Sequence, residues 1–262
     1  MSILGKSQQA IKIFGKDGLG KIVSNLVNKY KLRDFRSAKY RWKAGIKSEI
    51  EFWDAYFSTK GLYWADSYGY RFNPDLPLQS RPAALLPPQL EIHILDVGAG
   101  PLTYLGKKIE GKNVKITAID PLADEYDLIL NKYLIRPLVK TQKLSAEQLS
   151  KLFTPSTFDL VFARNCIDHA YSPEKAVLQM IDVVKSGCYV LLEHRQNEAE
   201  NAHYYGLHQW NFSLSTNGDF FISSKFDKVN MTKKYAKLCT ITCEIVTELG
   251  DGEWLITRIQ KR

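Results

Sequence analysis

The stretch HILDVGAGPLTYLG, from His93 to Gly106, decides how the rest of the chain is interpreted. It leads from an apolar segment through an acid into Gly-Ala-Gly-Pro, where missing side chains let backbone N–H groups come close to a ligand. An ordinary tight turn would use the same residues, so the neighbouring segments have to distinguish the two. If the turn joins a strand to a helix of a parallel sheet, the N-terminus of that helix favours ligand binding.

The chain from Leu90 onward predicts an α/β fold. Short apolar segments alternate there with amphipathic helical ones, which is the pattern of a doubly wound, mostly parallel sheet. A helix is predicted at 173–185, and alternating apolar residues around Gly250-Asp251-Gly252 predict a C-terminal antiparallel β-hairpin. The predicted strands are 92–97, 114–119, 158–163 and 187–193.

Residues 1–89 predict a basic, aromatic-rich helical arm and cap, and residues 90–262 predict the domain that contains the sheet. The first 50 residues hold twelve Lys or Arg against three Asp or Glu, whereas the whole chain has a net charge of +8. One face of a helix that ends near Gly61 carries Ile50, Trp53, Tyr56 and Phe57. A connector rich in proline and aromatic residues then leads to the boundary after residue 89.

The basic arm has several interpretations. It could contact a membrane surface, a nucleic acid or a phosphorylated substrate, or it could be a solvated helical face. No apolar run approaches the ~18 residues of a spanning helix, and the N-terminus lacks the pattern of a secretory signal. The sequence therefore predicts a cytoplasmic protein, with the arm as a candidate contact to the inner membrane surface. Four cysteines without a CxxC pair predict reduced core thiols and no metal site.

Polar residues end three of the predicted strands. Asp96 precedes the glycine turn, and Asp120 ends VKITAID, where its two oxygens can accept both hydroxyls of a ribose. The strand FDLVFARNCIDHAYSP delivers further polar residues to the same sheet edge. A dinucleotide fold would need a glycine where Thr103 stands, and Asp96 would repel a pyrophosphate. The pattern favours a nucleoside cofactor without phosphates.

With these residues the sequence resembles the class I S-adenosylmethionine-dependent methyltransferases. The resemblance covers roughly residues 90–195 and lies in ILDVGAGP, AIDP, LSAEQL and FDLVFARNCIDHA. It implies a Rossmann-like fold, S-adenosylmethionine as cofactor and S-adenosylhomocysteine as product. In many relatives an acid stands where this chain has Ser145, so the adenine contact departs from the family pattern.

The resemblance also implies the role of each cofactor residue. Glycines and an acid would line the methionine end, a second acid with its following proline would hold the ribose, a backbone N–H would meet the adenine, and an amide would flank the methionine portion. In that order these residues are Gly98, Gly100 and Asp96, then Asp120 and Pro121, then Ala146, then Asn165.

Acceptor residues are predicted from the segment Glu193–Phe212, which combines three histidines with aromatic residues. A hydroxyl acceptor must lose its proton as the oxygen attacks, and a histidine with a pKa near neutrality is a suitable base. His208 is the first candidate, His194 the second, and the pair Asp168-His169 an alternative that could instead be a turn and helix start. Substrate contacts are predicted at Tyr56, Arg71, His169 and Trp210. The aromatic cap could be a lid or simply packed structure.

The predicted function is methylation of a small-molecule acceptor, by O-methylation of a sugar or sugar nucleotide in surface-polysaccharide synthesis. A phosphorylated or nucleotide-linked acceptor would suit the basic arm. Methylation of nucleic acid is an alternative that the charge of the arm supports, but no recognition module and no Asn/Asp-Pro-Pro-Tyr/Phe motif accompanies it. A non-catalytic interaction module is the remaining alternative, and the intact glycine turn and ribose acid argue against it.

Overall fold

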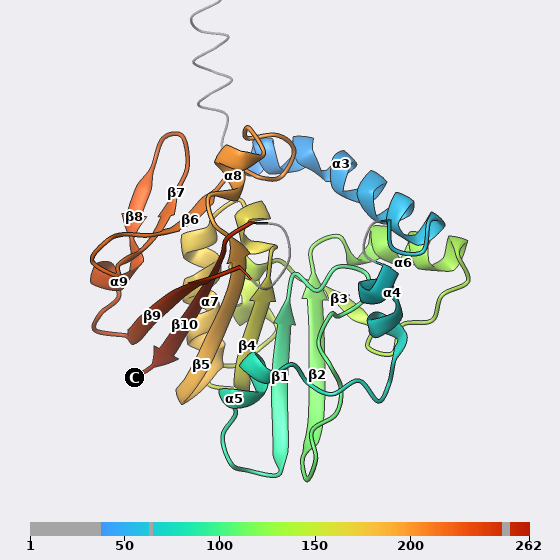
Figure 1. The fold of residues 1–262 in the computed structure, drawn as a ribbon, viewed down its shortest axis with the longest axis horizontal. Coiled ribbons are helices and arrows are strands. Elements are labelled where there is room, and N and C mark those ends of the chain that lie inside the picture. Colours follow the sequence, from blue (N-terminus) through green and yellow to red (C-terminus); the bar gives the residue numbers. More distant parts are fainter. Residues whose placement is uncertain (1–37, 63–64, 248–251) are drawn as a thin grey trace, which may run out of the picture. The chain divides into compact units, whose positions relative to one another are not determined.

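The computed structural model describes residues 38–62, 65–247 and 252–262 (Figure 1). The chain divides into two compact units, Met1–Arg41 and Trp42–Arg262. The predicted helical spacing, charge contacts and membrane contact of the arm up to residue 37 lie outside the described residues. Residues 42–89 are grouped with the sheet in the second unit, and the boundary predicted after residue 89 stays a prediction.

A seven-stranded sheet forms the centre of the second unit, in the order β3-β2-β1-β4-β5-β10-β9 (Figure 1). The strands from β3 to β5 are parallel, and β10 is antiparallel to both β5 and β9. The predicted mostly parallel, Rossmann-like sheet with a C-terminal antiparallel hairpin is therefore confirmed. The strands are β1 Glu91–Val97, β2 Asn113–Asp120, β3 Thr141–Lys143, β4 Phe158–Arg164, β5 Val184–Arg195, β9 Cys239–Val246 and β10 Trp254–Lys261.

The predicted strand and helix positions agree with these elements apart from their ends. The helix predicted at 173–185 is α7 (Pro173–Val183), which ends two residues early because β5 already starts at Val184. Residues 122–152, for which the sequence predicted no strand or helix, contain α6 (Ala123–Lys132), β3 and the 3-10 helix η1 (Ala146–Lys151). A second 3-10 helix, η2 (Ile167–His169), follows β4.

The two faces of the sheet are covered differently. On one face, Leu95, Val161 and Val190 pack with α7 and with a small second sheet. On the other face, Ile94, Phe162 and neighbours pack against the short helix α5 (Ser80–Ala84) and the chain around it. The second sheet is inserted between β5 and β9 and contains β6 (Asn211–Leu214), β7 (Phe220–Ser223) and β8 (Lys228–Asn230), flanked by α8 (Glu198–Asn201) and α9 (Met231–Lys234).

The expected helix after the glycine turn is absent from the described structure. Between β1 and β2 the chain forms turns instead of a helix. The residues just before α5 pack against this segment, on the side of the sheet where the helix was expected. Gln79 bonds the backbone of Tyr104 and Gly106, and the Leu78 N–H donates to the Lys108 carbonyl. A Cβ on Gly106 would lie 1.9 Å from the Pro77 carbonyl oxygen, so this close packing requires a glycine. The turn therefore receives no help from a helix dipole, and this expectation was wrong.

The helical cap consists of α3 (Ala38–Ser58) and α4 (Ala65–Phe72). Trp53, Tyr56 and Phe57 are buried against Tyr126 and Leu130 of α6, as the shared helical face predicted. Burial of an aromatic side chain stabilises a fold by about 1.5–3 kcal/mol, so these aromatic residues contribute to anchoring the cap. Among the described helices, none is long and apolar enough to cross a bilayer.

Candidate active site

A cavity of about 950 Å³ lies where β1, β2 and β4 end. This is the edge at which open α/β sheets bind ligands. The cap contributes Trp53, Tyr56 and Arg71 to its walls, and η2 and the chain after α8 contribute His169 and His208. The predicted cofactor residues that line the cavity are Asp96, Gly98, Gly100, Asp120, Pro121, Ala146 and Asn165.

The two glycines of the turn adopt the left-handed conformation, with φ of 67° at Gly98 and 64° at Gly100. A Cβ on Gly98 would lie 2.5 Å from the Cys166 sulfur, and one on Gly100 would lie 2.8 Å from the Trp53 ring. Neighbouring side chains therefore already approach the backbone here. The glycines are needed both for the turn and for the close contact between the β4 loop, the cap and the cavity floor.

The carboxylates of Asp96 and Asp120 are buried beside this turn. Asp120 accepts hydrogen bonds from the backbone N–H of Leu122 at 2.9 Å and of Gly100 at 3.2 Å, and burial raises its pKa to about 7. Burial raises the pKa of Asp96 to about 6, against the effect of a hydrogen bond from the Thr103 hydroxyl. At both positions the ionised carboxylate is therefore unfavourable unless a ligand brings a hydrogen-bond donor or a positive charge.

Thr103, which stands where a dinucleotide fold would have its third glycine, has a structural role that the sequence pattern did not show. Its hydroxyl donates to Asp96 and accepts from the Leu105 N–H at 3.1 Å. The side chain therefore ties Asp96 to the backbone of the turn, where a helix was expected to begin.

Arg71 reaches the cavity from α4 between three aromatic rings. Its guanidinium carbon lies 5.2 Å from the Trp53 ring centroid, 5.8 Å from that of Tyr56 and 5.5 Å from that of Tyr104. Nη1 donates to the Leu102 carbonyl, whereas Nε is buried and bonds no described residue. Burial lowers the pKa of Arg71. A buried guanidinium with an unused N–H group is a suitable partner for an anionic ligand group.

At the start of η1, Ala146 lines the cavity next to Ser145 and Glu147. Ser145 stands where many relatives have an acid. Its hydroxyl donates to Glu147, a buried residue that also accepts from the Ser172 N–H at 3.1 Å. A carboxylate is therefore present on this side of the cavity, two residues later in the chain. Asn165 follows β4 with φ of 46°, and its N–H donates to the Glu193 carbonyl at 2.8 Å.

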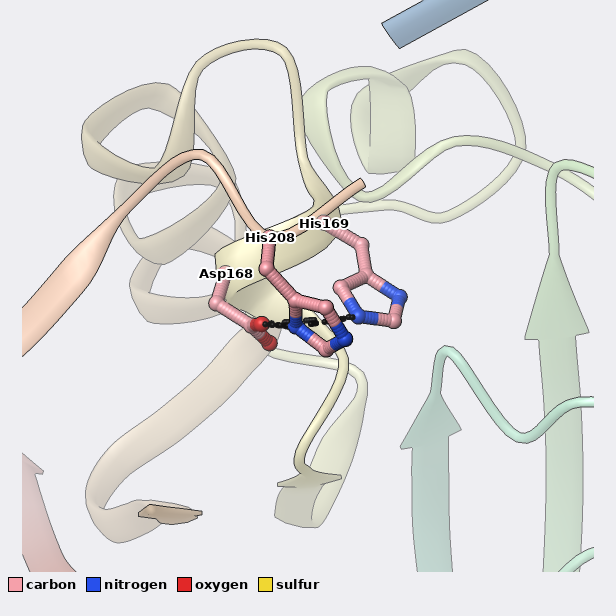
Figure 2. Close-up of side chains that lie close together, drawn as sticks. All are labelled: Asp168, His169 and His208. Carbon is pink, nitrogen blue, oxygen red and sulfur yellow. Dashed lines mark hydrogen bonds and ion pairs between the residues drawn. The ribbon is translucent and has the colours of Figure 1, made fainter. Parts of the chain in front are cut away.

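Asp168, His169 and His208 form a tight cluster at the cavity wall (Figure 2). His208 Nδ1 lies 2.8 Å from Asp168 Oδ2 and 3.2 Å from His169 Nε2. Burial opposes charge on His208, but the bond and the charge of Asp168 outweigh it and raise the His208 pKa. Burial likewise opposes ionisation of Asp168, yet the two imidazoles lower its pKa to about 2. Asp168 is therefore an ionised carboxylate that holds His208 through Nδ1.

Two predicted residues lie away from this cavity. His194 on β5 is buried, and its Nε2 accepts the backbone N–H groups of Ile167 at 3.1 Å and Cys166 at 3.4 Å. These bonds make His194 a brace for the chain at η2, and burial lowers its pKa to about 4, so the structure gives its predicted role as a base no support. Trp210 packs on the hydrophobic core beside the second sheet and does not line the cavity.

The comparisons with known proteins agree with this geometry. The family model of the methyltransferase domain matches residues 95–192, which include the glycine turn, Asp120 and η2. Residues 95–192 form a class I S-adenosylmethionine-dependent methyltransferase domain. S-adenosylmethionine is the cofactor of this methyltransferase domain. No curated protein sequence matches the chain.

Solved structures share the fold at low sequence identity. One is from the Haloferax volcanii complex between the Trm112 methyltransferase activator and a methyltransferase, with 13% identity, 82% of this chain and 97% of that chain covered, and a TM-score of 0.52. The N1-methyltransferase of Burkholderia thailandensis for 1,6-didemethyltoxoflavin has 13% identity, coverage of 85% and 89%, and a TM-score of 0.46. A Listeria monocytogenes S-adenosylmethionine-dependent methyltransferase has 12% identity, coverage of 70% and 97%, and a TM-score of 0.44.

Several cavity residues of this methyltransferase were not predicted. Glu49 stands on α3 one turn before Trp53, accepts from the Trp53 indole N–H at 2.8 Å and lies 3.8 Å from His169 Nδ1. The helical spacing of Glu49 and Trp53 could have indicated a polar residue beside the aromatic face. Glu147 is contained in the quoted LSAEQL segment, but nothing in the sequence shows that it turns inward. Tyr104 and Arg164 face each other across a cation–π contact of 4.8 Å, which only the fold brings together.

Proposed function

We propose that this methyltransferase methylates a hydroxyl group of a small molecule, a sugar or sugar nucleotide used in surface-polysaccharide synthesis. The observation that carries the proposal is the pair Asp168–His208 at the wall of the cavity that contains the cofactor residues. A hydroxyl is a weak nucleophile until its proton leaves, whereas a neutral amine or an enolate carbon needs no such base at the moment of attack. A fixed imidazole base therefore favours an oxygen acceptor.

The cavity residues fit S-adenosylmethionine by their chemistry. Asp120 has lone pairs left on both oxygens for the ribose hydroxyls, with Pro121 beside it, and Ala146 offers its backbone N–H to the adenine. Gly98, Gly100 and Asp96 would meet the methionine end, with Asn165 alongside. When bound, the cofactor supplies a methyl group activated by a positively charged sulfur. Buried carboxylates without bonded cations suit that charge.

We assign Arg71 to the carboxylate of the cofactor's methionine portion, which revises its predicted contact with the substrate. It lies beside the glycine turn, where its Nη1 bonds the Leu102 carbonyl and its Nε remains unused. Because no helix follows the turn in the described structure, no helix dipole assists there, and the Arg71 guanidinium supplies positive charge beside the turn. Tyr56 packs beneath Arg71 and would position it, not touch the acceptor.

His208 accepts the acceptor proton in this proposal. Because Nδ1 carries the proton shared with Asp168, Nε2 has the free lone pair. When an acceptor hydroxyl attacks the methyl group that the cofactor would supply, Nε2 of His208 would take the hydroxyl proton. Asp168 stabilises the resulting imidazolium and fixes its orientation. His169, next to His208, would contact the acceptor.

The cavity mouth supports a carbohydrate acceptor. Trp42, Phe52 and Tyr205 supply aromatic surface among its lining residues, and Glu49 and Glu198 supply carboxylates. Aromatic faces pack on the apolar faces of sugar rings, and carboxylates accept from sugar hydroxyls. For a phosphorylated or nucleotide-linked acceptor, Arg164 and Arg195 line the same cavity.

The cofactor part is tested with two ligands that differ only at the methionine end. S-adenosylhomocysteine has the amino-carboxylate group, and 5′-methylthioadenosine lacks it. Calorimetry of Arg71→Gln should show about 10- to 100-fold weaker binding of S-adenosylhomocysteine and unchanged binding of 5′-methylthioadenosine. Equal losses for both ligands would show that Arg71 acts through the fold and not through the carboxylate.

The acceptor part is tested by transfer of a radiolabelled methyl group from the cofactor. Free sugars, nucleoside diphosphate sugars, phenols and a single-stranded oligonucleotide would be offered in parallel to wild type and to His208→Asn. Label in a sugar product that is stable to base and dependent on His208 supports O-methylation of a carbohydrate. Label in the oligonucleotide alone would replace the proposal with nucleic-acid methylation.

A further inference from the structure

We infer that Asp168, His169 and His208 also form a binding site for a divalent transition-metal ion. Three potential ligand atoms from two segments converge there: Asp168 Oδ2, His169 Nε2 and His208 Nδ1 (Figure 2). Their separations are 2.8 Å, 3.2 Å and 3.4 Å. A set of two imidazoles and one carboxylate on one side of an ion leaves its other positions open to a ligand from the cavity.

The separations match those of a coordination sphere. With bonds of about 2.1 Å, neighbouring ligands of a metal ion are roughly 3.0 Å apart in octahedral and roughly 3.4 Å apart in tetrahedral geometry. The three measured distances lie close to this interval. An ion would therefore fit above the triangle of ligand atoms without a large movement of any side chain.

One tautomer of the cluster is compatible with the same inference. The Glu49 carboxylate lies 3.8 Å from His169 Nδ1, and with its proton on Nδ1 this histidine would present a lone pair on Nε2. His208 Nδ1 would then supply the one proton between Asp168 Oδ2 and His169 Nε2, and a metal ion could take the place of that proton.

The surroundings match those of metal ligands in two further respects. Asp168 is fully buried, and its Oδ1 has no hydrogen-bond partner among the described residues. An unpaired charged oxygen at such a position is costly, and a nearby cation would offset that cost. Glu49, whose Oε2 lies 3.8 Å from His169 Nδ1, is placed like the carboxylate that orients a ligating histidine in many metal sites.

The donor set selects the class of ion. Two imidazole nitrogens favour Fe²⁺, Co²⁺, Ni²⁺ or Zn²⁺, whereas Mg²⁺ and Ca²⁺ prefer sites made of oxygen alone. The other carboxylate near His208 is that of Glu198, whose Oε1 lies 4.0 Å from Nδ1. Glu198 is also paired with Arg195, so it is less available than Asp168.

The consequence for catalysis rests on the proposed function. An ion bound to His208 Nδ1 keeps the proton on Nε2, so the imidazole can no longer accept a proton from the acceptor. The ion and the base are then alternative states of one site. Metal loading should slow methyl transfer, and a chelator should restore it.

The test uses the full chain, freed of metal with a chelator and titrated with Co²⁺ alone. Bound Co²⁺ should show visible d–d absorption, and Mg²⁺ in excess should not compete. Asp168→Asn, His169→Gln and His208→Gln should each weaken Co²⁺ binding at least about tenfold. His203→Asn removes an exposed histidine outside the cluster and should bind like wild type. Unchanged affinity for S-adenosylhomocysteine would show that each variant is folded.

The outcomes separate the two proposals. Absence of saturable Co²⁺ binding, or wild-type affinity in the three cluster variants, would overturn the metal site and leave the base untouched. If Co²⁺ binds through the cluster and slows transfer, both proposals are supported. If it binds there and transfer becomes faster, the site stands and His208 is not the base.

Discussion

Buried carboxylates lie at two places around the same cavity under opposite electrostatic conditions. Beside the glycine turn, Asp96 and Asp120 accept hydrogen bonds from neutral groups among the described residues, and burial raises their pKa values to about 6 and about 7. In η2, Asp168 is equally buried, but two imidazoles lower its pKa to about 2. Burial is the same in each case, so the neighbouring groups decide the charge.

We call the region of Asp96 and Asp120 the cofactor end of the cavity and the region of Asp168 the acceptor end. The difference shows at which end the carboxylate charge is stabilised before a ligand binds. Asp168 already has the imidazoles of His208 and His169 beside it, so the cluster around it is organised before anything binds. Asp96 has only the charges of Arg71 and Lys107, which do not outweigh its burial, and no cation among the described residues lowers the pKa of Asp120. Hydroxyl donors or a positively charged ligand would supply what is missing. The cofactor end therefore stores a cost that binding can relieve, whereas the acceptor end is preorganised.

The largest expected effect is on the preorganised end. In His208→Asn the amide can still donate to Asp168, but no group replaces the lone pair of Nε2. Turnover should fall by about 10²–10⁴-fold, while the dissociation constant of S-adenosylhomocysteine stays within error. The measurement is a steady-state rate with a saturating acceptor, with His203→Asn as the matched control. A rate within tenfold of wild type would remove His208 as the base.

The next effect is on the unsatisfied end. Asp120→Ala removes the carboxylate that would accept the ribose hydroxyls and should cost about 2–3 kcal/mol of S-adenosylhomocysteine binding, roughly 30- to 150-fold. Calorimetry at pH 8, where the wild-type acid is ionised, gives the clearest comparison. If the variant is folded and binds like wild type, the ribose contact belongs to another residue.

The sequence predicted these two ends unequally. The order of apolar segments and the glycine turn were enough for the sheet, because both follow from short-range patterns. Asp96 and Asp120 followed from their places at the ends of strands, whereas Ala146 and Asn165 followed from the family resemblance. What the pattern could not show is that the helix after the turn is missing, because the segment around Gln79 that replaces it lies earlier in the chain.

The acceptor end depends on contacts between distant segments. Asp168 and His208 are 40 residues apart, and only the path of the chain after β5 brings them together. In the sequence, His194 and His208 are both histidines of the same aromatic-rich segment. In the fold, the backbone N–H groups of Cys166 and Ile167 donate to Nε2 of His194. Trp210 lies only two residues after His208 but packs against the core beside the second sheet. The sequence could not show that these two residues have different surroundings, because the difference depends on how the second sheet forms.

A smaller effect is expected at Thr103, whose hydroxyl donates to Asp96. Thr103→Val keeps the shape but removes the donor that favours the ionised carboxylate, so the folded pKa of Asp96 should rise further above its unfolded value. The lost bond should cost about 2 kcal/mol of unfolding free energy at pH 8 and less at pH 5, where the acid is protonated. Urea unfolding at both pH values measures this, with Thr103→Ser as control. An equal loss at both would assign the cost to packing.

The last effect tests whether the cofactor end really stores a cost. Because burial raises the folded pKa of Asp120 to about 7 from the ordinary 3.8, its contribution to stability is present below pH 4 and is lost as pH rises toward 7. Asp120→Asn cannot ionise, but its single carbonyl oxygen leaves one of the N–H groups of Gly100 and Leu122 without its bond, which costs about 1 kcal/mol. The variant should therefore be less stable than wild type at pH 5. Between pH 5 and pH 8 the wild-type acid ionises at a cost of about two pKa units, so the difference in unfolding free energy should move by about 2–3 kcal/mol in favour of asparagine, which more than offsets that loss at pH 8. Urea unfolding without cofactor at the two pH values gives this difference, and a shift in the opposite direction would mean that the ionised carboxylate is already stabilised before any ligand binds.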